Sequence, residues 1–132
     1  MKSPIIVALD MGPNNALDLA KEIDPQECRV KVGSQLFTIG GPLVIEKLND
    51  LGFDVFLDLK FHDIPNTVRK AVEATIKMGV WMLNVHSLGG REMLRAAYKA
   101  LEKEVPIKPL VVGVTVLTSL NDKALKEIGL GL

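Results

Sequence analysis

Four charged residues of alternating sign stand at the ends of apolar segments in this sequence. They are Asp10, Lys31, Asp58 and Lys60. Side chains alternate faces along a strand, so Asp58 and Lys60, two positions apart, would project on the same side. Carboxylates and ammonium groups that converge in one space are strongly coupled, and such a set can hold a lysine poised as an acid. A purely structural set of ion pairs is the alternative, and the residue types alone do not identify a reaction.

The apolar segments that carry these charges begin at intervals of 25 to 29 residues, which predicts a repeated structural unit. Several are rich in β-branched residues, as expected for strands that are buried on both faces. The predicted strands are Ile5–Leu9, Arg29–Val32, Val55–Leu57, Met82–Val85 and Leu110–Leu117. Their polar ends are Asp10, Lys31, Asp58 with Lys60, Asn84 with His86, and Thr118.

Between the strands, apolar residues recur with the spacing of a helix. The four stripes are Ala16, Leu17, Ala20 and Ile23, then Val44, Ile45, Leu48 and Leu51, then Val68, Ala71, Val72, Thr75 and Ile76, and finally Leu94, Ala97, Tyr98 and Leu101. Gly52 and Gly79 are placed to end helices, and Asn121 is placed to cap a short last helix. Gly89–Gly90 predicts a tight loop, with an anion cradle at a helix N-terminus as the alternative.

Five successive βα units predict an α/β fold with a parallel sheet and right-handed crossovers. A length of 132 residues favours a complete doubly wound domain such as flavodoxin. The unit length of about 27 residues also fits a consecutive run of a (β/α)₈ TIM barrel, in which eight units make roughly 215 residues. Parallel α/β proteins of both kinds place their chemistry at the carboxyl ends of the strands.

The composition is that of a globular protein, with 48% hydrophobic and 24% charged residues. Sixteen basic residues balance sixteen acidic ones, so the sequence carries no electrostatic footprint for nucleic acid or for an anionic membrane surface. The longest uncharged stretch, Val32–Ile45, is too short to span a bilayer, and the first apolar run predicts a strand rather than a signal peptide. The single cysteine, Cys28, permits no internal disulfide and fits a reducing cytosol.

The stretch Asp58–Thr67 contains the pattern Asp-x-Lys-x-x-Asp-Ile-x-x-Thr. This pattern resembles the signature of the orotidine 5′-phosphate decarboxylase family, in its bacterial type. Further segments that resemble the family in order and spacing are Val7–Asp10, Lys31–Gly33, Val80–His86 and Val114–Ser119. The resemblance covers essentially the whole chain but only a little over half of the family's barrel. It therefore favours a consecutive run of a (β/α)₈ barrel over a complete doubly wound domain.

The resemblance implies loss of CO₂ from orotidine 5′-phosphate to give UMP, the last step of de novo pyrimidine nucleotide synthesis, with no cofactor and no metal. Lys60 would deliver a proton to the ring carbon that loses CO₂. Asp58 would lie against the substrate carboxylate, where repulsion raises the energy of the ground state. Lys31 would hold the charge network together, and Asp10 would bond ribose hydroxyls.

The resemblance also implies a cytoplasmic homodimer that binds a nucleotide, with neither nucleic acid nor membrane as a partner. Asp63 and Thr67 would reach across the dimer interface into the partner's site, and Asp63 joins Lys60 and Asp58 as a catalytic residue. Ile64 is expected among the substrate-binding residues, and Thr118 would contact the pyrimidine. These residues complete the expected site: Asp10, Lys31, Asp58, Lys60, Asp63, Ile64, Thr67 and Thr118.

Three other functions fit the sequence less well. Metal-dependent relatives in the superfamily, such as hexulose-phosphate synthase, carry a glutamate where this sequence has Lys31, a cation that would repel Mg²⁺. A phospho-receiver domain would use Asp58 and Ser87, but it needs a second acidic residue beside Asp10 and a lysine where Thr118–Ser119 stand. Two histidines and one cysteine without close spacing do not predict a zinc site. His62 is expected to orient its loop, and His86 to line the pocket or to satisfy a strand end.

About five of a barrel's eight units fit into 132 residues. Residues 1–132 are therefore expected to form a single α/β domain that is an incomplete barrel, with two unpaired sheet edges and one uncovered face. The phosphate-binding residues are expected in later units. Because phosphate binding energy contributes to transition-state stabilisation, the chain alone is expected to have little or no decarboxylase activity, and an inactive fragment is the alternative to an active enzyme.

Overall fold

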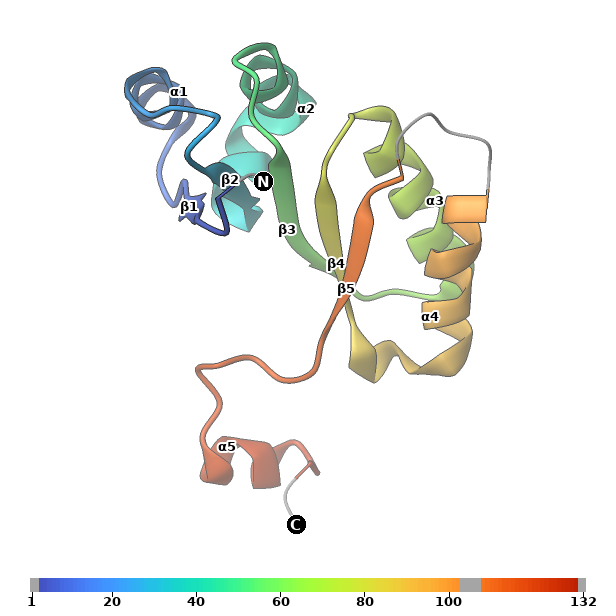
Figure 1. Cartoon of the computed structure of the whole chain (residues 1–132). Coiled ribbons are helices and arrows are strands. Elements are labelled where there is room, and N and C mark those ends of the chain that lie inside the picture. Colours follow the sequence, from blue (N-terminus) through green and yellow to red (C-terminus); the bar gives the residue numbers. More distant parts are fainter. Residues whose placement is uncertain (1–2, 103–107, 131–132) are drawn as a thin grey trace.

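The apolar segments form the strands of one parallel sheet, and the amphipathic segments between them form helices (Figure 1). The computed structural model describes residues 3–102 and 108–130. The elements are β1 (Ile6–Ala8), α1 (Pro13–Glu22), β2 (Arg29–Gly33), α2 (Ser34–Asp50), β3 (Val55–Phe61), α3 (Pro65–Lys77), β4 (Met82–His86), α4 (Gly90–Lys99), β5 (Leu110–Val114) and α5 (Asp122–Glu127). Short 3₁₀ turns, η1 (Ser87–Gly89) and η2 (Ala100–Glu102), flank α4.

The strand order distinguishes the two predicted architectures. The order is β1-β2-β3-β4-β5, and each strand pairs in parallel with its successor. A doubly wound sheet of the flavodoxin type has the order 2-1-3-4-5 and helices on both faces, whereas a barrel adds its strands in sequence. The doubly wound alternative is therefore wrong, and with it the receiver domain. The consecutive run of a barrel is the architecture that the chain adopts.

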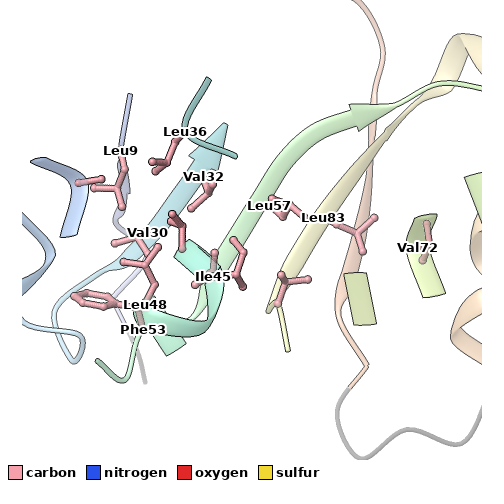
Figure 2. Close-up of a cluster of buried hydrophobic side chains, with 14 of the residues drawn as sticks. Leu9, Val30, Val32, Leu36, Ile45, Leu48, Phe53, Leu57, Val72 and Leu83 are labelled. Atoms are coloured by element: carbon pink, nitrogen blue, oxygen red, sulfur yellow. The ribbon is translucent and has the colours of Figure 1, made fainter. Parts of the chain in front are cut away.

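The hydrophobic core lies between the sheet and its helices (Figure 2). Its large, fully buried side chains come from the strands and from the helices that cover them. They include Leu9, Val30, Val32, Leu36, Ile45, Leu48, Leu57, Val72 and Leu83. Residues on the opposite face of the outer strands, such as Ala8 and Val112, are exposed, so the described helices cover only one face of the sheet.

Most of the predicted helix ends are confirmed. Gly52 and Gly79 follow α2 and α3 with φ angles of 89° and 72°, in the left-handed region that glycine adopts without a Cβ penalty. The side chain of Asn121 accepts a hydrogen bond of 3.0 Å from the backbone N–H of Ala124 and so caps α5. Gly90, with φ at 81°, links η1 to α4, which confirms the tight loop.

Two helices differ from their predictions. The apolar stripe predicted α2 only around Val44, but the helix begins at Ser34 and bends at Gly41, whose φ of 59° accommodates the kink before Pro42. Tyr98 is exposed, so it was wrongly assigned to the buried stripe of α4. Helical spacing identifies a face but cannot show which neighbouring element covers the edge of that face.

The strand ends also differ from the sequence predictions. β3 continues to Phe61, so Asp58 lies inside the strand rather than at its end. β5 ends at Val114, which pairs with His86, the last residue of β4. Thr118 therefore lies in a turn beyond β5 and does not close the strand as predicted. The apolar run continues past Val114, but β4 offers no residue there for it to pair with.

The sheet is open in the described part of the chain. β1 and β5 are its outer strands, and within residues 3–102 and 108–130 neither has a second neighbouring strand. The helix α5 buries none of its residues and stands apart from the sheet in Figure 1. The helices of the described residues are all too short or too polar to cross a membrane. The predicted open edges and uncovered face are thus present.

Candidate active site

Four charged side chains, one from the segment after β1 and the others from β2 and β3, meet in one cluster. Lys60 Nζ lies 2.6 Å from Asp58 Oδ1, and Lys31 Nζ lies 3.3 Å from Asp58 Oδ2. Lys31 Nζ also lies 3.5 Å from Asp10 Oδ1. The result is a continuous chain of alternating charge, which we call the charged cluster: Asp10, Lys31, Asp58 and Lys60. The predicted convergence of the four side chains is confirmed, while the chemical roles of the four residues remain predictions.

Strand register explains why Asp10, Lys31 and Asp58 meet. Ala8 of β1 pairs with Lys31, and Gly33 of β2 pairs with Asp58, so the charged positions of neighbouring strands lie close to one level. Gly33 borders the cluster, because a Cβ atom placed there would lie 3.8 Å from both Asp10 Oδ1 and Lys31 Nζ. The register therefore places the charges next to each other without any long loop.

Asp58 is the centre of the cluster and its most buried member. Its side chain is 13% exposed, whereas that of Asp10 is 70% exposed. Asp58 bonds two ammonium groups, and Asp10 bonds one of them from the solvent side. Ion pairs that face solvent contribute little to stability. The exposed carboxylate of Asp10 is therefore free to contact another partner, whereas Asp58 is held in place by two ammonium groups.

Two opposing effects act on the pKa of Asp58. Desolvation by burial raises it, but hydrogen bonds from Lys60 and Asn84 and the positive charges of Lys60 and Lys31 lower it. The lowering effects are together the larger, so the pKa of Asp58 lies below its ordinary value. The carboxylate is therefore ionised at neutral pH, and the cluster presents a fixed negative charge between two cations.

This shift predicts an acid-sensitive contribution to stability. A carboxyl whose pKa is lower in the folded than in the unfolded state stabilises the fold above its unfolded pKa, near 3.9, and loses that contribution as pH falls through the folded pKa. We therefore expect the free energies of unfolding of the unmodified chain and of Asp58→Asn to approach each other as pH falls through that range. Urea unfolding at a series of pH values measures the difference. Curves for the unmodified chain and Asp58→Asn that stay parallel through this pH range would contradict the assignment.

Asn84 belongs to this site, although no role was assigned to it from the sequence. It lies on β4 and is only 3% exposed. Its Nδ2 donates to Asp58 Oδ1 at 2.7 Å, and its Oδ1 accepts from the backbone N–H of Lys60 at 2.8 Å. The available signal was a polar residue within an otherwise apolar strand, because such a residue is buried only where it finds partners.

The strict alternation predicted for β3 fails at Lys60. Its φ of 51° is the one positive value among the described non-glycine residues, and the pairing of β3 with β4 shifts register between Leu57 and Phe61. The ammonium group nevertheless reaches Asp58. Lys60 is thus in the cluster because of a local irregularity in β3, not because of regular alternation alone.

The other four predicted site residues lie outside the cluster. Asp63 and Ile64 are exposed in the loop after β3, where Asp63 Oδ1 accepts a hydrogen bond of 2.6 Å from the backbone N–H of Ile64. Thr67 is exposed in the first turn of α3, and Thr118 is exposed beyond β5. Within the ranges that the structure describes, no hydrogen bond or ion pair joins these residues to the cluster.

The two histidines lie against each other, with ring centroids 5.2 Å apart. His86 Nδ1 is buried and has no hydrogen-bond partner among the described residues. In the same part of the chain, no three His, Cys, Asp or Glu side chains are grouped so that they could hold a metal ion. Cys28 is buried, and burial, followed by the charges of Asp24 and Glu27, raises the pKa of its thiol.

Comparison with known sequences gives one consistent result. The family described as "Orotidine 5′-phosphate decarboxylase / HUMPS family" matches residues 3–131. The orotidine 5′-phosphate decarboxylase of Marinomonas sp. (strain MWYL1) is 54% identical over 130 residues, which are 98% of this chain and 55% of the relative. That of Hydrogenovibrio crunogenus is 55% identical over 127 residues, which are 96% of this chain and 53% of the relative. The chain thus spans about half the length of these curated relatives.

Solved structures agree with the sequences. The crystal structure of orotidine 5′-phosphate decarboxylase from Lactobacillus acidophilus matches with a TM-score of 0.88 and 39% identity, over 96% of this chain and 59% of that one. The enzyme from Methanocaldococcus jannaschii, in complex with the inhibitor BMP, matches with a TM-score of 0.70 and 25% identity, over 77% of this chain and 48% of that one. Each match thus covers most of this chain and about half to three fifths of the solved chain.

Proposed function

The chain belongs to the orotidine 5′-phosphate decarboxylase / HUMPS family, and from this premise we propose that its charged cluster is the reacting centre for decarboxylation of orotidine 5′-phosphate to UMP. The observation that carries the proposal is the contact of Lys60 Nζ with Asp58, 2.6 Å apart, with Lys31 on the other carboxylate oxygen. A proton donor and a fixed negative charge then lie side by side, as loss of CO₂ from an anionic substrate requires.

The proposed reaction needs only these groups. The bond between the pyrimidine ring carbon and the carboxylate breaks, CO₂ leaves, and the electron pair stays on the ring carbon. The ammonium group of Lys60 stabilises this developing charge and then donates its proton to the same carbon, so one proton is consumed for each UMP formed. Asp58 faces the substrate carboxylate, and their repulsion is relieved as CO₂ departs.

The remaining members of the cluster support this pair. Lys31 contacts both Asp58 and Asp10, so it holds the two carboxylates at a fixed separation. The exposed side chain of Asp10 is available to accept hydrogen bonds from ribose hydroxyls. No metal or cofactor forms part of this proposal. The position that is a glutamate in the metal-dependent relatives is Lys31, whose positive charge would oppose a bound Mg²⁺.

We extend the proposal to a homodimer in the cytoplasm. Asp63, Ile64 and Thr67 are exposed on one loop and the helix turn that follows it, which leaves them accessible to a second subunit. In this arrangement Asp63 and Thr67 enter the partner's site, Ile64 is among the residues that bind the substrate, and Thr118 contacts the pyrimidine. The buried thiol of Cys28 is compatible with the reducing cytoplasm.

We also propose that residues 1–132 are a single α/β domain that supplies the first five βα units of a family barrel. The open edges of β1 and β5 in the described sheet would then pair with strands of the remaining units. The face opposite the helices would become the barrel interior. The phosphate-binding residues would come from those later units, in keeping with the usual phosphate site after strands seven and eight.

Complementation tests the proposed reaction and the proposed incomplete domain. The partner is a polypeptide with the part of the Marinomonas sp. relative that this chain does not match, and we call the pair the complemented chain. We expect the absorbance of orotidine 5′-phosphate to fall with the complemented chain. It should change little with the 132-residue chain alone, because that chain lacks the residues expected to bind the substrate phosphate. Size-exclusion chromatography shows whether the pair forms. Robust turnover by the chain alone would overturn the proposed incomplete domain, and a stable pair without turnover would overturn the proposed reaction.

A further inference from the structure

The carboxamide of Asn84 connects the two groups on which the proposed chemistry depends. Building on the proposed function, we propose that Asn84 is a positioning residue, which holds the backbone of Lys60 in an irregular conformation and ties it to the Asp58 carboxylate. Its two hydrogen bonds, of 2.8 Å to the Lys60 N–H and 2.7 Å to Asp58, use both the oxygen and the nitrogen of one amide. Asn84 therefore fixes the relative position of donor and carboxylate.

The irregularity in β3 explains why Lys60 needs this partner. Leu57 pairs with Leu83 and Phe61 pairs with Val85, so four steps along β3 correspond to two steps along β4. The extra residues form a bulge that includes Lys60, and Asn84 is the residue of β4 opposite it. A bulged residue is left out of the regular ladder of hydrogen bonds. The Asn84 side chain accepts the Lys60 N–H that the ladder leaves available.

The backbone of Lys60 is also costly to maintain. Its φ of 51° is in the left-handed region, which non-glycine residues occupy only when the surrounding structure imposes it. Such conformations are concentrated at functional sites. The Asn84 bond stabilises this conformation at the residue whose side chain is the proposed proton donor. Loss of the bond should let β3 relax and move the ammonium group away from its position beside Asp58.

The chemistry of an amide makes the requirement specific. An aspartate at position 84 could accept from Lys60, but it could not donate to Asp58 and would place a second carboxylate beside it. A leucine of similar size could form neither bond. Only a side chain that donates on one side and accepts on the other satisfies both neighbours.

Thr75 offers a matched control. It is the other buried polar residue among those described, with 1% exposure, and its Oγ1 donates to the backbone carbonyl of Ala71 at 2.8 Å within α3. Thr75→Val removes one buried hydrogen bond with little change in shape, and it does so without touching the cluster. If the loss of any buried hydrogen bond were enough to change the Asp58 pKa or kcat, Thr75→Val should change them as Asn84→Leu does.

The test begins with the unmodified 132-residue chain, isotopically labelled. A scalar coupling across the hydrogen bond, between the Lys60 amide nitrogen and Asn84 Cγ, is expected, and its absence would overturn the proposal even if every variant fails to fold. Carbon-13 titration of the Asp58 carboxyl then compares folded variants. We expect its pKa to rise in Asn84→Leu, to rise further in Asn84→Asp and to stay unchanged in Thr75→Val. An unchanged Asp58 titration in folded Asn84→Leu would overturn the proposal.

Kinetics of the complemented chain separate positioning from binding. Asn84→Leu should lower kcat by about 10²-fold, the loss associated with a misplaced reacting group, with little change in KM. Thr75→Val should retain both constants. A rise in KM with kcat retained would assign Asn84 to substrate binding and contradict the proposal. If the unmodified complemented chain shows no turnover, the proposed reaction fails, while the coupling and the titration still decide the role of Asn84 in the cluster.

Discussion

Replacing Lys60 with alanine should reduce kcat of the complemented chain by at least about 10⁴-fold, because it removes both a general acid and a preorganised positive charge. Binding of UMP should persist, since the product carries neither the departing carboxylate nor the developing charge. Turnover is measured from the absorbance of orotidine 5′-phosphate, and UMP affinity by calorimetry. A large loss of turnover with retained UMP affinity is expected for an interaction that is strongest in the transition state.

The matched control for this variant is Lys21→Ala. Lys21 pairs with Asp18 on the exposed surface of α1, at 3.0 Å, so the same substitution there removes an ammonium group and an ion pair that does not include a member of the cluster. Turnover and UMP affinity should both remain as in the unmodified protein. If Lys60→Ala kept substantial turnover while remaining folded, Lys60 would not be the proton donor.

The second large effect is expected for Asp58→Asn. This change keeps the shape of the side chain but removes the negative charge that Lys31 and Lys60 share. We expect kcat to fall by about 10²- to 10³-fold, as for the loss of one preorganised electrostatic group. Because repulsion of the substrate carboxylate also disappears, orotidine 5′-phosphate should bind more tightly, whereas UMP affinity should change little. Equilibrium binding and single-turnover rates measure the two effects separately.

The direction of the substrate affinity decides how Asp58 acts. Tighter substrate binding with slower turnover supports repulsion between Asp58 and the substrate carboxylate. Weaker substrate binding together with slower turnover would mean that Asp58 acts mainly by orienting Lys60, to which it is bonded at 2.6 Å. Asp18→Asn, which loses an exposed carboxylate, should show neither effect.

The charged cluster could be predicted from the sequence because its causes are local and periodic. Strands that recur at regular intervals bring their carboxyl ends to one edge, and this places Asp10, Lys31 and Asp58 together. Val55 and Leu57 lie on the face of β3 opposite Asp58, and both are buried. Length alone favoured the wrong architecture, because a doubly wound domain and five units of a barrel contain similar numbers of residues. The pairing order of the strands was needed to distinguish them.

The features that could not be predicted depend on contacts between strands. The left-handed backbone of Lys60 arises where β3 carries more residues than β4 between two pairs, and no pattern within β3 reveals that mismatch. The role of Asn84 follows from the same mismatch. Thr118 was placed at the end of a strand because the apolar run continues to Leu117, but β5 ends where β4 ends. In each case the neighbouring strand, rather than the local sequence, sets the outcome.

The most direct test of the central claim is a crystal structure of the complemented chain with bound UMP. We expect the pyrimidine over the charged cluster, with Lys60 Nζ about 3 to 3.5 Å from the ring carbon that carried the carboxylate, the distance of a reacting pair. We also expect Asp58 next to the space that CO₂ leaves. A pyrimidine bound away from the cluster, with Lys60 in contact only with Asp58, would contradict the assignment of these charges to the reaction.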